Sequence, residues 1–353
     1  PSPRYLMAMA PTAASGEIVM FGGVDSAGTI LSDTWVWDGT SWAQKFPVHS
    51  PGGRYSSSMA FDAARGEVIL VGGFPLDQRT WVWDGLDWTS HSQANSPAVR
   101  WQHAIAYDAG RQQVVLFGGY SYNATTLGDT WLWDGTTWTQ ANPSTSPTPR
   151  VSSSMAYDMA RGNVVLFGGQ VLVGGQTSRN SETWTWNGTS WMLKALANSP
   201  PPFASTTHAM AYEASSQRVV LFGPDSAGVY LGLGNDTWVW DGSFWTQKWP
   251  TDQPGPRASH AIAYDEARQQ VVLFGGGETS GIGGLLNDTW IWRPAAQSPS
   301  TDTAAFVSEA ISDNVPMLPG QAFTKTWTLR NTGSTTWTTG ITLQYASGNA
   351  GCS

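Results

Sequence analysis

The chain has 353 residues, of which only 12% are charged, and its formal net charge is −8. This balance disfavours binding to duplex nucleic acid, which rests on many Lys and Arg contacts to phosphate, and disfavours attachment to anionic lipid. No apolar run approaches the roughly eighteen residues that a membrane-spanning helix needs.

The dominant feature is a phrase that returns six times before about residue 293. It reads Tyr-Asp-x-x-Arg-x-x-Val-Val-Leu-Phe-Gly-Gly, then a loop, then Asp-Thr-Trp-x-Trp-Asp-Gly-x-x-Trp. The residue before the double glycine marks each unit: Phe21, Val71, Phe117, Phe167, Phe222 and Phe274. A period of about fifty residues, built from short strand-like runs, indicates a β-propeller with one unit in each blade.

The third unit shows how one repeat builds one blade. Residues 103–107 alternate large and small side chains, which predicts a strand, and residues 113–117 form an apolar run typical of a buried strand. We expect the double glycine to end that strand. Residues 130–133 and 136–140 flank an Asp-Gly pair, the strongest short hairpin signal. The unit therefore predicts four antiparallel strands.

Bulky and small residues also follow the repeat. The innermost strand carries alanines on one face, such as Ala104 and Ala106, and larger residues on the other; we expect the small face to lie near the crowded axis and the large face to pack between blades. Of the 21 tryptophans, 17 occupy three repeat-locked positions, such as Trp35, Trp37 and Trp42. Packing in every blade explains this repetition better than sugar stacking, which needs one or two rings.

The sixth unit is incomplete. It stops at Trp290-Ile-Trp292-Arg293-Pro294, with no Asp-Gly turn and no closing strand. Either residues 294–300 form a poor fourth strand, or a closing strand lies before Pro1. Six is therefore the number of blades that this chain contains. Residues Pro1 to Arg4 resemble the approach to a repeat, so no signal peptide is identified there.

The double glycine, the aromatic spaced from it and the closing Trp resemble the kelch repeat, and resemble still more closely the propeller of the galactose oxidase type. The resemblance covers residues 1–293 and implies six four-stranded blades. Galactose oxidase is a copper radical enzyme, and the family's site includes a tyrosine cross-linked to cysteine. The single cysteine, Cys352, lies outside the predicted propeller, which argues against the oxidase and against any intrachain disulfide.

After the propeller the composition changes. Residues 294–305 are rich in Pro, Ser, Ala and Thr and predict a linker. Residues 306–353 then contain the pattern Lys325-Thr-Trp327, Asn331-Thr-Gly333 and Trp337, which resembles the Ig-like domain in the central part of selective-autophagy cargo receptors and in bacterial surface proteins. Such a sandwich needs about 100 residues. Only 48 remain, so we expect the N-terminal part of a truncated domain.

Three histidines, His103, His208 and His260, occupy the same repeat position at the start of the innermost strand. Imidazoles that converge on the axis could bind copper or zinc. The alternative is that each histidine lies between blades with local hydrogen bonds, too far from the others to share one ion. We favour this alternative, so that no cofactor and no metal ligand is predicted.

Arginines recur just before the innermost strand, and by symmetry they encircle one mouth of the channel: Arg4, Arg54, Arg100, Arg150 and Arg257. An aromatic residue follows in the first three units: Tyr5, Tyr55 and Trp101. Guanidinium beside a ring could hold a carboxylate, a sulfate or an acidic sugar. The alternative is structural pairing between blades, with carboxylates available at Asp33, Asp129, Asp236 and Asp288.

These observations predict a non-catalytic binding scaffold that holds a protein or polysaccharide on one propeller face, within a longer multidomain chain. Abundant Gly, Ser, Thr and Trp with scarce Lys suit a secreted or cell-surface bacterial protein, which would be extracellular. The alternative is an enzyme, a diverged oxidase or a lyase, with its site at the channel mouth. The loops between the second and third strands are long at residues 170–181, 224–235 and 277–287, and they hold no pair of carboxylates spaced for glycoside hydrolysis.

Overall fold

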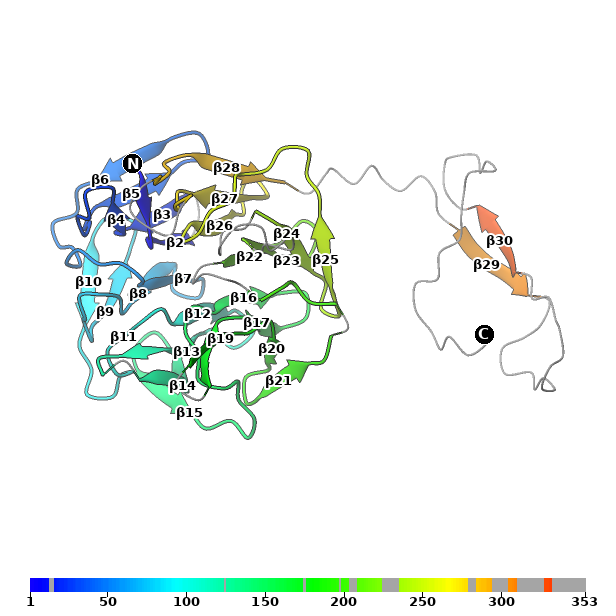
Figure 1. The fold of residues 1–353 in the computed structure, drawn as a ribbon, viewed down its shortest axis with the longest axis horizontal. Helices are drawn as coiled ribbons and strands as arrows, with labels where there is room; N and C mark the ends of the chain where they lie inside the picture. Colours follow the sequence, from blue (N-terminus) through cyan, green and yellow to red (C-terminus); the bar gives the residue numbers. More distant parts are fainter. Residues whose placement is uncertain are drawn as a thin grey trace. The chain divides into compact units, whose positions relative to one another are not determined.

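The structure is a computed structural model that describes residues 1–12, 16–123, 125–173, 176–196, 198–202, 208–223, 235–278, 284–293, 304–309 and 327–331. The chain divides into two compact units, Pro1–Arg293 and Pro294–Ser353 (Figure 1). Both consist of β-strands where they are described. Across these residues, no helix is long and apolar enough to pass through a bilayer.

The first unit is a ring of six antiparallel sheets, which confirms the predicted six-bladed propeller (Figure 1). Blades 1 to 5 each have four strands, and blade 6 has three among the described residues. From the axis outward, blade 1 has β2 (Ala8–Pro11), β3 (Ile18–Phe21), β5 (Thr34–Trp37) and β6 (Trp42–Lys45), and blade 2 has β7 (Ser58–Asp62), β8 (Glu67–Val71), β9 (Thr80–Trp83) and β10 (Trp88–His91). Blade 3 has β12 (Ala104–Asp108), β13 (Gln113–Ser121), β14 (Thr126–Trp133) and β15 (Trp138–Ala141), and blade 4 has β16 (Ser154–Asp158), β17 (Asn163–Phe167), β20 (Thr183–Trp186) and β21 (Trp191–Lys194). Blade 5 has β22 (Ala209–Glu213), β23 (Arg218–Phe222), β24 (Thr237–Trp240) and β25 (Trp245–Lys248), and blade 6 has β26 (Ala261–Asp265), β27 (Gln270–Phe274) and β28 (Thr289–Trp292).

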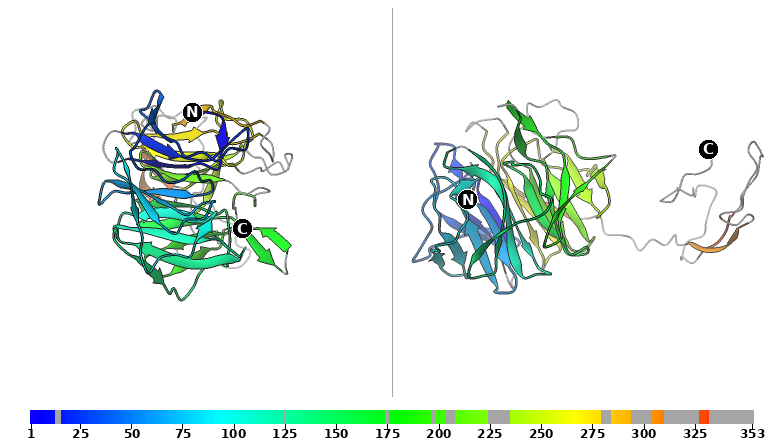
Figure 2. Two further views of the ribbon diagram at one scale, coloured as in Figure 1. Left: turned by 90° about the vertical axis from the view of Figure 1, so that its left-hand side faces the viewer. Right: turned by 90° about the horizontal axis from the view of Figure 1, so that it is seen from below.

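Shorter strands decorate one face of the ring. β1 (Arg4–Tyr5) pairs with β4 (Val24–Asp25), and β11 (Arg100–Trp101) pairs with the end of β13. A hairpin of β18 (Gln170–Val173) and β19 (Gln176–Arg179) occupies part of a stretch that the sequence predicts as a long loop. Figure 2 shows this green hairpin standing out from the body of the propeller.

Strand boundaries in blade 3 differ from the predicted ones: β14 begins at Thr126 instead of residue 130, and β15 covers Trp138–Ala141 instead of residues 136–140. In blade 3 the double glycine does not end the strand, because β13 continues to Ser121 and pairs there with both β11 and β14. The register shifts between Phe117 and Gly119. Gly118 and Gly119 have φ of +69° and +99°, and this left-handed backbone forms a bulge that lets the ladder continue.

The double glycines are also the points where the next blade docks. Gly119 N–H donates to the carbonyl of Arg150 at 2.9 Å, and the equivalent bond joins Gly23 to Arg54 at 2.9 Å. A Cβ on Gly118 would lie 2.6 Å from the same Arg150 carbonyl oxygen. The backbone of one blade therefore approaches its neighbour too closely for any side chain at this position.

Gly118→Ala should lower the free energy of unfolding by at least about 2 kcal/mol, since it adds a backbone clash to left-handed strain. Gly85→Ala is the matched control, because Gly85 also has positive φ, +102°, but its Cβ would meet nothing within 4 Å. We expect a smaller loss in the control, about 1–2 kcal/mol from strain alone. Urea unfolding of both variants measures the difference; equal losses would show that the close approach costs nothing.

The core is a series of clusters that each join two neighbouring blades. Ala8 and Ala10 of blade 1 pack with Met59, Trp81 and Trp83 of blade 2. The small face therefore packs between blades as the large face does, and packing of the large face between blades is confirmed. Alanines of the small face also reach the axis, since Ala10, Ala60 and Ala106 line a cavity there. In radially stacked sheets both faces meet neighbours, so a small face is needed to receive a large one.

The repeat-locked tryptophans pack between blades, as predicted. Trp83, Trp133, Trp186 and Trp240 on the third strands are at most 1% exposed. The closing tryptophans of the fourth strands donate their indole N–H to a threonine of the preceding blade: Trp88 to Thr34, Trp138 to Thr80, Trp191 to Thr130, Trp245 to Thr183 and Trp42 to Thr289, at 2.8–3.0 Å. Each of these five closing indoles thus has its polar group satisfied by the blade it packs against, whereas the buried N–H groups of Trp83, Trp133, Trp186 and Trp240 have no hydrogen-bond partner among the described residues.

The ring is closed between blade 6 and blade 1 by the same contacts that join the other blades. The Trp42 ring lies edge-on to Phe274, with ring centroids 5.2 Å apart. The Leu6 N–H donates to the Ser259 carbonyl at 2.9 Å. Blade 6 therefore completes the circle although the structure describes no fourth strand for it.

In the second unit the structure describes one antiparallel pair, β29 (Ala304–Glu309) and β30 (Trp327–Asn331). Phe306 faces Leu329 in its register. Most of the predicted linker, residues 294–305, and the remainder of the predicted Ig-like segment, 306–353, lie outside the described residues.

Candidate binding surface

The predicted arginines lie beneath the face that carries β1 and β11, and each is buried. Arg100 is 1% exposed and binds Asp129 through two hydrogen bonds, at 2.7 and 2.8 Å. The same guanidinium donates to the carbonyls of Gly118 and Ala98, at 2.9 and 3.0 Å. Asp129 also accepts the indole N–H of Trp131 at 2.6 Å. The arginine therefore ties the chain before the blade to the double glycine and to the third strand.

Five blades repeat this arrangement, with every guanidinium at most 3% exposed. The pairs are Arg4–Asp33, Arg54–Asp77, Arg100–Asp129, Arg150–Glu182 and Arg257–Asp288. Both partners of each pair belong to one repeat, whereas the structural alternative placed them in neighbouring blades. Burial alone would raise the pKa of Asp129, but the hydrogen bonds and charge of Arg100 hold this pKa below its usual value.

A structural role explains these contacts without a ligand, since each arginine already has a carboxylate and two carbonyl partners. The binding role suggested by the sequence for Arg4, Arg54, Arg100, Arg150 and Arg257 stays a prediction. Their aromatic neighbours Tyr5, Tyr55 and Trp101 differ, because each is only partly buried. The rings are therefore more accessible to a ligand than the guanidinium groups beside them.

Two of these rings belong to a continuous group of four, here called the aromatic platform: Tyr55, Phe74, Trp101 and Tyr120. Neighbouring ring centroids lie 5.6 Å apart from Tyr55 to Phe74, 6.1 Å from Phe74 to Trp101 and 5.7 Å from Trp101 to Tyr120. Backbone pairing fixes their order, because Tyr55 bridges to Phe74 and Trp101 pairs with Tyr120. The platform therefore spans blades 2 and 3.

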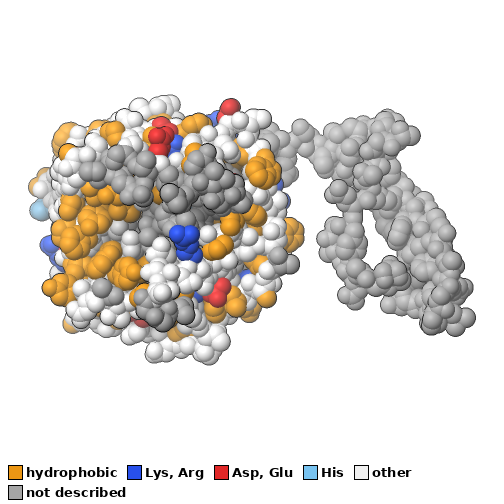
Figure 3. Space-filling model, in the orientation of Figure 1, with side chains coloured by type: hydrophobic (Ala, Val, Ile, Leu, Met, Phe, Trp, Pro, Cys, Tyr) orange, Lys and Arg blue, Asp and Glu red, His pale blue; other side chains and the backbone are white. Residues whose placement is uncertain are grey.

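The platform reaches solvent and carries no charge of its own. Phe74 is 41% exposed, and the nearby loop residue Tyr122 is 75% exposed. Figure 3 shows hydrophobic side chains gathered on the left of the propeller face, over the strands of blades 2 and 3, with few charged groups among them. Soluble monomers rarely expose large contiguous apolar patches, so this group is a candidate interaction surface.

Half of this platform was not predicted from the sequence. Phe74 and Tyr120 each follow a double glycine directly, at a position where units 1, 4 and 6 have Val24, Gln170 and Gly277. An aromatic residue at that position was the available signal. That signal could be read only once the structure showed that blade 2 lies beside blade 3 and that Phe74 pairs with Tyr55 and Tyr120 with Trp101.

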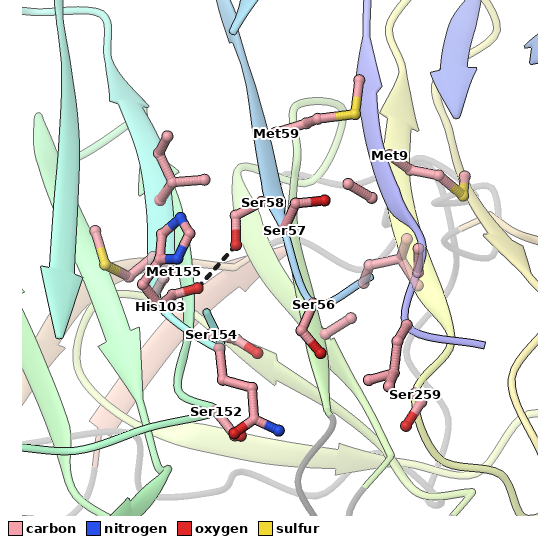
Figure 4. A pocket seen from close by; sticks show the side chains of 18 of the residues that line it. Met9, Ser56, Ser57, Ser58, Met59, His103, Ser152, Ser154, Met155 and Ser259 are labelled. Atoms are coloured by element: carbon pink, nitrogen blue, oxygen red, sulfur yellow. Dashed lines mark hydrogen bonds between the residues drawn. The ribbon is translucent and has the colours of Figure 1, made fainter. Parts of the chain in front are cut away.

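A polar chamber of about 190 Å³ opens at the axis beside this face (Figure 4). Its rim is a chain of backbone hydrogen bonds that pass from blade to blade: Leu6 to Ser259, Ser56 to Leu6, Gln102 to Ser56 and Ser152 to Gln102, at 2.8–3.1 Å. All five of these residues have positive φ, between +54° and +60°. Non-glycine residues adopt this conformation rarely, so these contacts hold a strained backbone in place.

The three predicted histidines line this chamber. They are buried and point toward the double glycines of the preceding blades, as the proximity of His103 to Gly72 and of His208 to Gly168 indicates. The His208 Nε2 lies 3.0 Å from the Phe167 carbonyl. Among the described residues, no group of three or more His, Cys, Asp or Glu side chains could hold a metal ion. The histidines therefore lie between blades, against the double glycines of the preceding ones.

Burial lowers the pKa of His103 to about 3, with the Arg100 charge adding to the effect, and lowers the pKa of His208 to about 4. Burial and the Arg257 charge lower the pKa of His260 to about 3. In the unfolded chain these histidines take up protons near pH 6.5, whereas in the folded chain they do so only near pH 3–4. Their contribution to the free energy of unfolding is therefore fully present above pH 6.5 and is lost as the solution is acidified.

We expect His103→Ser to remove about a third of the decline in unfolding free energy between pH 6.5 and pH 4.5, since three histidines share it. Serine suits the position, because Ser57 and Ser153 occupy it in blades 2 and 4. Urea unfolding at a series of pH values measures the slope, and His91→Ser is the control at a histidine outside the chamber. An unchanged slope in His103→Ser would contradict the burial argument.

A second chamber, of about 500 Å³, opens at the opposite mouth and is mostly apolar and aromatic. Six large side chains from the innermost strands line both chambers and separate them: Met9, Met59, Ile105, Met155, Met210 and Ile262. Tyrosine hydroxyls at this mouth accept from turns of the preceding blade, as Tyr157 does from Gly110 at 2.9 Å. The enzyme alternative at a channel mouth stays a prediction.

Comparison with known proteins concerns the C-terminal segment. Residues 310–353 match the family described as "Ig-like domain from next to BRCA1 gene". A stretch of 57 residues, 16% of this chain, is 39% identical to "Next to BRCA1 gene 1 protein" of Mus musculus. The match covers 6% of that protein. The Ig-like segment predicted from Trp327 and its neighbours is therefore confirmed, whereas the kelch type of the propeller stays a prediction.

Proposed function

We propose that this chain is a non-catalytic scaffold that binds a protein on the aromatic platform. The observation that carries the proposal is the continuous series of four partly exposed rings on one propeller face. Tyr and Trp are enriched where protein interfaces concentrate their binding energy, and charged residues are depleted there. Rings held by backbone pairing are already ordered, so binding costs little side-chain entropy.

The organisation of the chain supports a binding role. A six-bladed propeller presents a broad, rigid face, and the segment that follows matches an Ig-like domain. We infer that the Ig-like segment displays the propeller or joins it to further domains. The kelch type of repeat, a polysaccharide as the other predicted ligand class and an extracellular, bacterial setting remain expectations from the sequence.

Trp101→Ala and Phe74→Ala should each weaken partner binding at least about tenfold, because central aromatic residues dominate such interfaces. Peptides selected from a random library against the whole chain serve as the probe, and fluorescence anisotropy gives their affinity for each variant. Trp249→Ala is the matched control, since Trp249 is 76% exposed but lies outside the platform. Selected peptides that ignore the platform variants would contradict the proposal; binding of a glycan panel that these variants abolish would favour the polysaccharide instead.

A further inference from the structure

The larger chamber, at the mouth opposite the aromatic platform, is lined by described residues of all six blades. Its volume of about 500 Å³ falls within the range of small-molecule sites, about 300–1,000 Å³. The methionine and isoleucine side chains that separate it from the polar chamber form its floor. Each innermost strand adds an alanine to the wall, such as Ala60 and Ala106. Blades 2 to 6 each add a half-buried aromatic ring: Phe61, Tyr107, Tyr157, Tyr212 and Tyr264.

The tyrosine hydroxyls of this wall are engaged by the preceding blade. The Tyr107 hydroxyl accepts from the Ala64 N–H at 3.0 Å, and the Tyr264 hydroxyl donates to the Glu213 carboxylate at 3.4 Å. Burial raises the pKa of Tyr107, and burial together with the Glu213 charge raises the pKa of Tyr264 to about 12. These hydroxyls are therefore uncharged at neutral pH, and the rings present mainly carbon to the chamber.

The charged groups at this mouth do not favour an anion. Among the described residues that line the chamber, the charged side chains are the carboxylates of Glu17 and Glu266, and none is Lys or Arg. The arginines of the nearby turns pair with an aspartate of the same turn, as Arg65 does with Asp62 at 2.7 Å. An anion would therefore enter the chamber without a counter-charge, and a strongly polar molecule would find few side-chain hydrogen-bond partners on the wall.

We propose that this chamber is a binding site for a small, uncharged and largely apolar molecule, about the size of two or three joined rings. The ligand rests on the methionine and isoleucine floor and is surrounded by the aromatic wall. Burial of apolar surface drives binding, and the methionine side chains adapt to the shape of the ligand. The site lies at the other mouth from the aromatic platform, so this inference does not depend on protein binding there.

The probe is N-phenyl-1-naphthylamine, an uncharged aromatic dye whose fluorescence rises in apolar surroundings. Titrated into the whole chain, it should bind saturably and raise the melting temperature with dye concentration. The matched anionic probe, 1-anilinonaphthalene-8-sulfonate, has the same rings with a sulfonate added and should bind at least about tenfold more weakly. Equal affinity for the two dyes would contradict the assignment of an uncharged ligand.

Two pairs of variants locate the site. Phe61→Glu places a carboxylate in the aromatic wall and should weaken binding of the uncharged dye at least about tenfold. Phe61→Tyr is its matched control and should change the affinity by no more than about twofold, because four other blades have tyrosine at this position. Ala63→Trp places an indole at the exposed rim of the chamber and should weaken the dye about fivefold or more. Ala64→Trp, at the next residue of the same turn and outside the lining, should not. Because Ala63 is exposed, the second pair decides the question if Phe61→Glu does not fold.

Trp101→Ala separates this site from the aromatic platform and should leave the affinity for the dye unchanged. If that variant loses the dye while Ala63→Trp keeps it, the dye binds the platform and the proposal is overturned. Dye binding that does not saturate, or that neither chamber variant weakens, would overturn it as well, and would leave protein binding on the platform untouched.

Discussion

Replacing Arg100 by alanine should lower the free energy of unfolding by about 3–5 kcal/mol, one of the two largest losses expected in this protein. The loss is large because the variant leaves the partners of the guanidinium buried and unpaired. Asp129 keeps its charge beside Trp131 but loses two hydrogen bonds and its counter-charge, and the Gly118 carbonyl loses a donor. Because the Arg100 side chain is 1% exposed and the Asp129 side chain 20% exposed, water screens this pair less than it screens a surface ion pair.

Thermal and urea unfolding of Arg100→Ala measure this loss, with Arg179→Ala as the control on the exposed strand β19. The control should change stability by no more than about 0.5 kcal/mol. A double variant, Arg100→Met with Asp129→Leu, should recover much of the loss, because apolar replacement of both partners removes the stranded charge. Unchanged stability in Arg100→Ala would instead leave the arginines free for the ligand role that the sequence suggested.

Trp138→Ala should be comparably destabilising, by about 3–5 kcal/mol, since it empties a large site between blades 2 and 3. Trp138 is 1% exposed, packs 5.3 Å from Trp133 and donates its N–H to Thr80 at 2.8 Å. Removal of the ring therefore leaves both a cavity and an unpaired buried hydroxyl acceptor.

The comparison that isolates burial is Trp249→Ala, because Trp249 is the same residue type at 76% exposure. That variant should stay within about 0.5 kcal/mol of the wild type. Urea unfolding followed by far-UV circular dichroism measures both variants, since a change in indole content complicates fluorescence. If Trp138→Ala unfolds at the wild-type midpoint, the repeated tryptophans do not hold the blades together as described.

The sequence predicted the propeller well because every blade solves one packing problem with the same residues. The Asp-Gly turn before Trp138 and the alternation around Ala104 both mark strands that the structure contains. The prediction of strand limits failed where the geometry departs from the average repeat. At Gly118 a bulge prolongs β13, and the β18–β19 hairpin lies in a loop that the repeat does not specify.

The candidate surface was predicted only in part, for a different reason. Spacing shows that an arginine and an aspartate recur together, but it does not separate a partner in the same blade from one in the next. Tyr55 and Trp101 were singled out because they follow an arginine. Phe74 and Tyr120 join them only when two neighbouring blades are laid side by side, which requires the folded ring.

Among the described residues, each kind of contact between blades repeats in the same sense around the circle. A large face meets a small one, an indole N–H reaches back to a hydroxyl, and an amide such as that of Ser56 reaches back to the carbonyl of Leu6. Each blade thus presents large side chains and an indole on one side, and on the other side the small face and the hydroxyl that receive those of its neighbour. A propeller built in this way can gain or lose whole blades by tandem gene duplication or deletion without a new kind of contact between blades, so long as the angle between blades adjusts.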